Sequence, residues 1–130
     1  MIAIDTNVLV RHLVRDDADQ AERADAFLRS LTAERPGFIT TVVWAEVYWA
    51  LTQPYRLNRR QVAESLRDML QSVEIHSEHP SLVAEALAAA ITKGADFADA
   101  LIGAAARRAR CTEVVTFDKQ AAKILNWREL

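Results

Sequence analysis

Glycine is scarce in this sequence, where only Gly37, Gly94 and Gly103 occur among 130 residues. Three scattered glycines cannot build the glycine-rich loop of a P-loop or of a dinucleotide-binding fingerprint, and the Gly-x-Ser-x-Gly turn of serine hydrolases is also missing. These absences exclude P-loop nucleotide binding, Rossmann-type cofactor binding and serine-hydrolase chemistry.

Cysteine is scarcer still. Cys111 is the only one, so the chain can form neither an internal disulfide nor a zinc site with several thiolates. We interpret Cys111 as a small, partly buried apolar residue. The three histidines, His12, His76 and His79, lack metal-ligand spacing and are predicted to lie at or near the surface.

Long hydrophobic runs are absent too. No apolar stretch approaches the ~20 residues that cross a bilayer, and the first residues lack the positive charge of a signal peptide. We therefore expect a cytoplasmic protein with no membrane association. Because 51% of the 130 residues are apolar, the chain can bury one core of ordinary size, which predicts a single domain over residues 1–130.

The formal net charge of −2 does not indicate a basic nucleic-acid-binding domain. Positive charge is nevertheless concentrated in two groups of arginines, Arg56, Arg59 and Arg60, and Arg107, Arg108 and Arg110. Two interpretations stay open for them. We favour solvated helix faces over phosphate contacts, although guanidinium groups are good phosphate ligands.

Apolar strand-like segments alternate with segments of helical periodicity. Strands are predicted at 1–5, 37–40, 72–76 and 113–116, and helices at 19–33, 41–53, 58–71, 80–93, 97–110 and 119–125. This alternation predicts an α/β fold, a three-layer sandwich in which helices flank a mostly parallel central sheet.

Acidic residues occur where such a fold places ligand sites. Asp5 and Asp118 follow predicted strands, and Asp96 and Asp99 lie three residues apart at the start of a helix. Glu46 lies in an almost wholly apolar helix, where an inward-facing carboxylate is costly unless it is paired or binds a metal. Because the carboxyl ends of parallel strands line the ligand crevice, all five acids are expected to converge there.

Each acid also has a purely structural interpretation. Asp96, Asp99 and Asp118 suit helix N-termini as caps or as partners of the helix dipole, and Asp5 suits a turn. Capping does not explain Glu46, and it does not require acids from four segments to meet. Clustered carboxylates favour hard divalent cations, so we expect one or two Mg²⁺ or Mn²⁺ ions.

Four segments together resemble the PIN-domain family, and within it the VapC-type toxins of bacterial toxin–antitoxin pairs. They are "IDTNVLVRHL", "TTVVWAEVYWAL", "ADFADALIGAAA" and "EVVTFDKQAAKI", in the family's order and over nearly the whole chain. The resemblance implies a catalytic and metal-binding quartet of Asp5, Glu46, Asp99 and Asp118, with Asp96, Thr6 and Thr116 as possible additional site residues.

The resemblance also implies a function: a magnesium- or manganese-dependent endoribonuclease that cleaves structured RNA and is held inactive by a cognate antitoxin, in a chain that forms a homodimer. Glu46 would bind the metal or orient the attacking water. The sequence departs from the family pattern at "LNWREL", which lacks the usual glycine-containing turn and leaves the pairing of a final strand open.

Arg11 and Arg15 are weak candidates for RNA contacts, and equally suit exposed positions on a helix. Trp44, Tyr48 and Trp49 could stack on unpaired bases, but core packing is the stronger interpretation. Any aromatic surplus beyond the core would mark a dimer interface or an antitoxin groove.

Two other function classes also use acidic residues at the ends of strands. Aspartyl-phosphate chemistry needs a second acid two residues after Asp5, where Asn7 stands. A non-catalytic binding module, either receiver-like or an interaction-only PIN domain, is the alternative that stays open.

Overall fold

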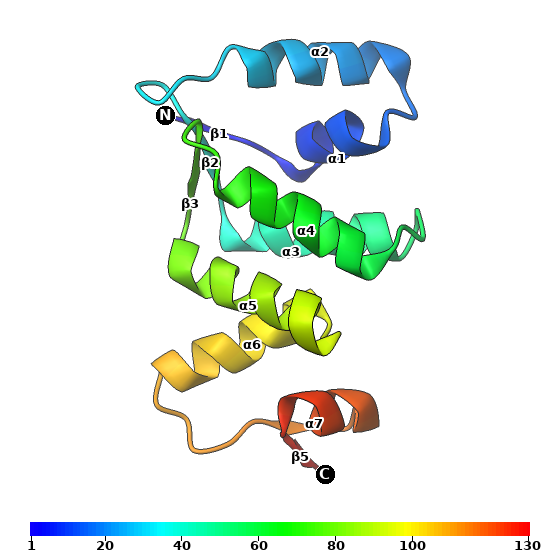
Figure 1. The fold of residues 1–130 in the computed structure, drawn as a ribbon, viewed down its shortest axis with the longest axis vertical. Helices are drawn as coiled ribbons and strands as arrows, with labels where there is room; N and C mark the ends of the chain where they lie inside the picture. Colours follow the sequence, from blue (N-terminus) through cyan, green and yellow to red (C-terminus); the bar gives the residue numbers. More distant parts are fainter.

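Pairs of helices separate the first strands of this α/β fold, which a computed structural model describes over residues 1–130 (Figure 1). The strands are β1 (Ile2–Ala3), β2 (Gly37–Ile39), β3 (Ile75–Ser77), β4 (Val115–Thr116) and β5 (Arg128–Glu129). The helices are α1 (Thr6–Val14), α2 (Ala18–Arg29), α3 (Thr41–Thr52), α4 (Arg59–Leu70), α5 (Pro80–Lys93), α6 (Phe97–Arg108) and α7 (Lys119–Leu125). The predicted α/β class is confirmed.

All strand pairings are parallel, as predicted. Strands β1, β2 and β3 form one sheet in that order, with Gly37 of β2 opposite Ile2 on one side and Ile75 on the other. Strands β4 and β5 form a second, two-stranded sheet in which Val115 lies opposite Arg128. The open question about "LNWREL" is thereby answered, because this segment does contribute a final paired strand.

Asn126 replaces the missing glycine before that strand. It ends α7 in the left-handed conformation, with φ 57° and ψ 44°. Asparagine is one of the few non-glycine residues that adopts this conformation readily. The chain therefore turns from α7 into β5 without a glycine.

One helix, α1, was not predicted as an element. Its sequence "TNVLVRHLV" is rich in β-branched residues and follows a strand directly, so its periodicity is hard to separate from that of a longer strand. The buried side chains of Leu9 and Val10 hold it against the core. Elsewhere the predicted helices end up to four residues too late, as at α2, while α5 and α7 have the predicted bounds.

Helix α3 is the centre of the hydrophobic core. Trp44 and Tyr48, one turn apart, are 0% and 2% exposed, and the Tyr48 ring lies 5.4 Å from that of Phe97 on α6. Trp44 also donates a 2.8 Å hydrogen bond from Nε1 to Ser77 Oγ at the end of β3. Core packing is therefore the right interpretation for Trp44 and Tyr48, whereas Trp49 is 60% exposed.

The surface corrects one prediction and agrees with another. Cys111 is exposed rather than partly buried, because it follows the end of α6 in an open turn. His76 and His79 are exposed, and His12 is half-buried beside Asp25, with 2.7 Å between Nδ1 and Oδ1. None of the helices combines the length and the apolarity needed to cross a bilayer.

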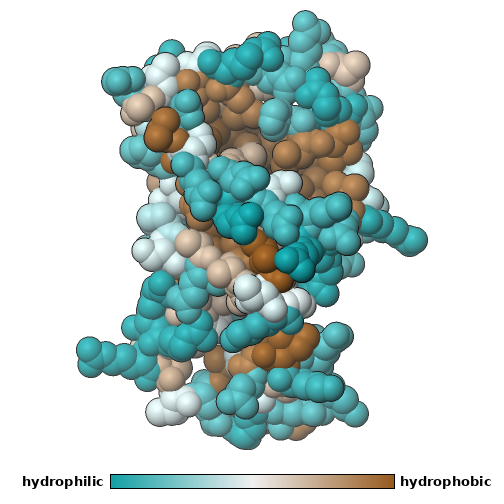
Figure 2. All heavy atoms as spheres, in the orientation of Figure 1, coloured by the Kyte–Doolittle hydropathy of each residue, from teal (hydrophilic) through white to brown (hydrophobic).

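Apolar atoms also reach the surface in a groove between α2 and α4. Figure 2 shows these atoms as a brown hollow bordered by hydrophilic side chains. Five apolar residues line the groove, Leu13, Leu28, Leu31, Met69 and Ile75.

Candidate metal-binding and active site

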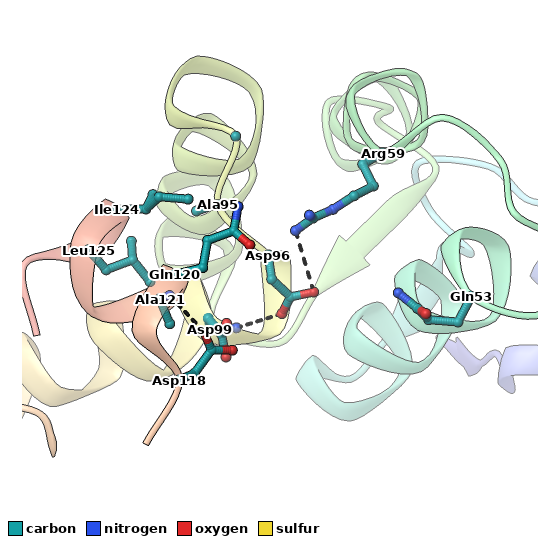
Figure 3. A pocket seen from close by; sticks show the side chains of 11 residues that line it. Gln53, Arg59, Ala95, Asp96, Asp99, Asp118, Gln120, Ala121, Ile124 and Leu125 are labelled. Carbon is teal, nitrogen blue, oxygen red and sulfur yellow. Dashed lines mark hydrogen bonds and ion pairs between the residues drawn. The ribbon is translucent and has the colours of Figure 1, made fainter. Parts of the chain in front are cut away.

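Three acidic side chains share one cavity between α6 and α7. Asp96 and Asp99 come from the start of α6, and Asp118 precedes α7 (Figure 3). Gln53, just beyond α3, Arg59, at the start of α4, and Gln120 on α7 complete its polar lining. The structure thus brings three of the five predicted acids together.

Helix capping fixes the positions of two of these acids. The Asp96 carboxylate accepts a 3.0 Å hydrogen bond from the backbone N–H of Asp99, and the Asp118 carboxylate accepts a 2.9 Å bond from the N–H of Ala121. Each cap uses one carboxylate oxygen, and a carboxylate has lone pairs to spare. The capping interpretation is therefore correct and leaves oxygen atoms available for a ligand.

Asp99 is the acid with the least compensation. Its carboxylate accepts no hydrogen bond, and burial raises its pKa, with repulsion from Asp96 and then Asp118 acting in the same direction. Arg59 opposes this effect only in part. Because the surroundings of Asp99 disfavour its ionised form, they favour the binding of an additional cation.

The sequence names Arg59 only as one of a group of arginines, with phosphate contact as the less favoured interpretation, and the structure places it in the lining of this cavity. Its Nη2 lies 3.8 Å from Asp96 Oδ2, and its Nε donates a 3.1 Å hydrogen bond to the Tyr48 hydroxyl. That hydrogen bond is the main reason why the pKa of Arg59 is raised. Arg59 follows Pro54 and a loop, so nothing in its own segment links it to acids on α6.

Asp5 and Glu46 lie outside the lining of this cavity. Asp5 is exposed at the N-cap of α1 and makes no capping bond with its side chain. Glu46 is also exposed, so the expectation of an inward-facing carboxylate was wrong: it projects from the face of α3 opposite the core. Its Oε2 accepts a 2.6 Å hydrogen bond from Thr6 Oγ1, which ties α3 to the start of α1.

A family model for the PIN domain matches residues 2–125. The chain belongs to the PIN domain family. Neither the curated proteins nor the solved structures include a significant match to it. PIN domains are generally metal-dependent nucleases, so the carboxylates described above are the natural place to look for a metal site in this one.

The donor set of this PIN domain suits a hard divalent cation. Asp96, Asp99 and Asp118 offer carboxylate oxygens, the ligands that Mg²⁺ and Mn²⁺ prefer, and no thiolate or imidazole lines the cavity. The structure contains no group of three or more acids, histidines or cysteines already arranged to hold one ion. Ionised carboxylates repel one another and approach closely only around a cation.

Thr116 is engaged with the backbone rather than with a carboxylate. Its Oγ1 accepts a 3.0 Å hydrogen bond from the N–H of Asp118, which shapes the turn between β4 and α7. Thr6, by contrast, holds the carboxylate of Glu46. Thr6 therefore orients an acidic side chain directly, whereas Thr116 positions the backbone of an acidic residue, Asp118.

The two arginines considered for RNA contacts already have partners in the chain. Arg11 donates to Gln20 at 2.7 Å and lies 3.3 Å from Asp16, and Arg15 pairs with Asp25 at 2.7 Å. A role in RNA binding stays a prediction for both arginines.

Three of the six arginines in the two groups form ion pairs on helix surfaces. Arg60 pairs with Glu64 one turn away at 3.1 Å, and Arg107 and Arg108 both pair with Glu85 on α5. Solvated helix faces are therefore the right interpretation for these three arginines. Arg59 differs from them because it faces the acidic cavity.

Proposed function

We propose that this PIN domain is a magnesium- or manganese-dependent endoribonuclease, the VapC-type toxin of a toxin–antitoxin pair. The observation that carries the proposal is the cavity in which Asp99, without a hydrogen-bond partner, faces Asp96 and Asp118. A divalent cation from solution would neutralise acids that share one arginine, which lies 3.8 Å from Asp96.

Asp5, Glu46, Asp99 and Asp118 are the proposed catalytic and metal-binding residues, with Asp96 as an additional ligand. A bound Mg²⁺ or Mn²⁺ would supply charge stabilisation at the phosphate and would activate water. Asp5 and Asp99 have carboxylates without internal hydrogen bonds, which leaves both oxygens of each available. We assign them the principal ligand roles.

Glu46 is proposed to orient the attacking water. The Thr6 hydroxyl occupies Oε2 at 2.6 Å and fixes the rotation of the carboxylate, so Oε1 is left as an acceptor for a water proton. In hydrolysis of a phosphodiester, the water oxygen bonds to phosphorus, the P–O3′ bond breaks, and the departing oxygen takes a proton. Thr6 would thus act as a positioning residue.

A non-catalytic, interaction-only PIN domain is the competing function. The observation in its favour is that no three potential ligands are arranged at metal-binding distance. Such a domain would keep Asp96 and Asp118 as helix caps and would have no use for an uncompensated Asp99. The endoribonuclease is favoured because it gives Asp99 a role.

The test is cleavage of total bacterial RNA by the purified wild-type protein, with gel analysis of the fragments. We expect a small number of defined fragments with Mn²⁺ or Mg²⁺, and intact RNA when EDTA is present. Single-stranded DNA, incubated under the same conditions, is the control for substrate class. RNA that remains intact with either ion, while the ions bind, would favour the interaction-only domain.

We further propose that the chain forms a homodimer through α3. Trp49 is 60% exposed near the carboxyl end of α3, a large apolar side chain on a helix that otherwise contributes mainly to the core. Trp49→Glu is expected to convert a dimer into a monomer by light scattering, whereas Glu22→Lys on exposed α2 should not. A monomeric wild type would refute the proposal.

A cognate antitoxin is the other proposed partner. The apolar groove between α2 and α4 has the form that receives an amphipathic segment. A toxin of this kind is expected to arrest the growth of bacteria that express it. Relief of that arrest when the antitoxin is co-expressed would support this role.

A further inference from the structure

Arg59 has more hydrogen-bonding capacity than the structure uses. Its guanidinium group carries five N–H donors, and only Nε has a hydrogen-bond acceptor, the Tyr48 hydroxyl at 3.1 Å. The Asp96 carboxylate attracts Nη2 but stays 3.8 Å away, beyond hydrogen-bond distance. The two terminal nitrogen atoms therefore point toward an acidic cavity without a bonded acceptor (Figure 3).

The Tyr48 hydroxyl holds this guanidinium in place. Tyr48 is 2% exposed, and its ring packs against Phe97, the first residue of α6 and the neighbour of Asp96. The ring of Tyr48 is held in the core and does not move with the exposed side chain of Arg59. The hydrogen bond therefore fixes Arg59 relative to the start of α6. Less conformational entropy is then lost when the arginine binds a ligand.

The neighbouring arginine makes a different kind of contact. Arg60, the next residue on α4, is paired with Glu64 at 3.1 Å on the solvent face. Arg59 instead extends toward the cavity, supported by a core residue rather than by an acid one turn away. The same helix start thus carries one arginine in a surface ion pair and one with free donors at the candidate site.

We propose that Arg59 binds a phosphate oxygen of the RNA substrate at the rim of the cavity, and that Tyr48 is the positioning residue that holds it there. The proposal rests on the endoribonuclease function. Phosphate offers paired oxygens that match the planar fork of a guanidinium, and it would supply the acceptors that Nη1 and Nη2 lack. Arg59 would then fix where the RNA backbone crosses the acids.

The first measurement is RNA affinity, with Arg59→Gln compared with Arg60→Gln. Both substitutions remove one positive charge from adjacent positions. We would titrate a short labelled single-stranded RNA by fluorescence anisotropy with Ca²⁺, an oxygen-binding cation of the same charge as Mg²⁺. Arg59→Gln is expected to weaken binding about tenfold and to lower the slope of log K against log salt by about 0.7, while Arg60→Gln changes affinity less than about twofold.

The second measurement separates substrate contact from damage to the site. Mn²⁺ binding without RNA, followed by calorimetry, should be as tight or tighter in Arg59→Gln, because a positive charge near Asp96 opposes cation binding. A variant whose cavity had collapsed would lose affinity for both ligands. Tyr48→Phe, which keeps the ring and removes the hydroxyl, is expected to weaken RNA binding by about two- to fivefold with Mn²⁺ binding unchanged.

The outcomes distinguish this inference from the function on which it rests. If the wild type neither binds nor cleaves RNA, the endoribonuclease proposal fails and the role of Arg59 fails with it. If the wild type cleaves RNA but Arg59→Gln keeps its RNA affinity and salt slope, only the role of Arg59 is refuted. Equal losses in Arg59→Gln and Arg60→Gln would refute it as well, because they would indicate a general effect of charge.

Discussion

Replacement of Asp99 by asparagine is expected to lower the rate of RNA cleavage by about 100- to 10,000-fold. The substitution keeps the size of the side chain and removes the charge at the centre of the acidic cavity. Asp19→Asn, on exposed α2 and outside the cavity, is the matched control and should cleave RNA at the wild-type rate. The measurement is the initial cleavage rate of one identified RNA under identical Mn²⁺.

Stability measurements show whether Asp99→Asn is still folded. Because burial, Asp96 and Asp118 raise the pKa of Asp99 in the folded protein, its ionised form opposes folding. The metal-free variant should therefore melt about 1–3 °C above the wild type near pH 7, and this gain should vanish as the pH falls through the pKa of Asp99. If the variant melts no lower than the wild type and yet does not cleave RNA, the loss of activity comes from the catalytic step and not from unfolding.

Manganese gives the same variant a second test. A cation that binds only the folded wild type raises its melting temperature, and Asp99→Asn should respond much less. An equal response of the two proteins would place the metal elsewhere. Full cleavage activity in folded Asp99→Asn would refute its assignment to the site.

Local pattern was enough to predict much of the fold. The parallel strands and the limits of α5 and α7 follow from apolar periodicity and from Pro80 and Gly94, which bound α5 at its two ends. Helix α1 was missed because its β-branched residues suit a strand as well as a helix. Its helical state depends on burial of Leu9 and Val10, which is a tertiary effect.

Part of the candidate site could be predicted from the sequence, because three of the five predicted acids line the cavity, but its geometry could not. The spacing of Asp96 and Asp99 indicates a helix start, and the cap on Asp99 N–H confirms it. The orientation of Glu46 could not be predicted, since α3 is apolar on nearly all sides and gives no amphipathic signal. The sequence does not connect Arg59 with Asp96, because the start of α4 and the start of α6 meet only in the tertiary structure, where the two side chains lie 3.8 Å apart.

The second large effect is expected from Trp44, and it concerns stability rather than RNA binding. Trp44→Ala should lower the free energy of unfolding by about 3–5 kcal/mol, because a fully buried indole leaves a cavity in the core. Trp44→Phe keeps most of the packing and loses the hydrogen bond to Ser77, for an expected cost of about 1–2 kcal/mol. Urea denaturation of both variants measures these values.

The same variants decide between the two roles that the sequence left open for this tryptophan. A base-stacking residue would lose RNA affinity on substitution while keeping its stability. Trp44 has no exposed surface on which a base could stack, so RNA affinity per folded molecule should be unchanged in Trp44→Phe. A stable Trp44→Ala protein with weakened RNA binding would contradict the core role and would place the indole in the RNA interface.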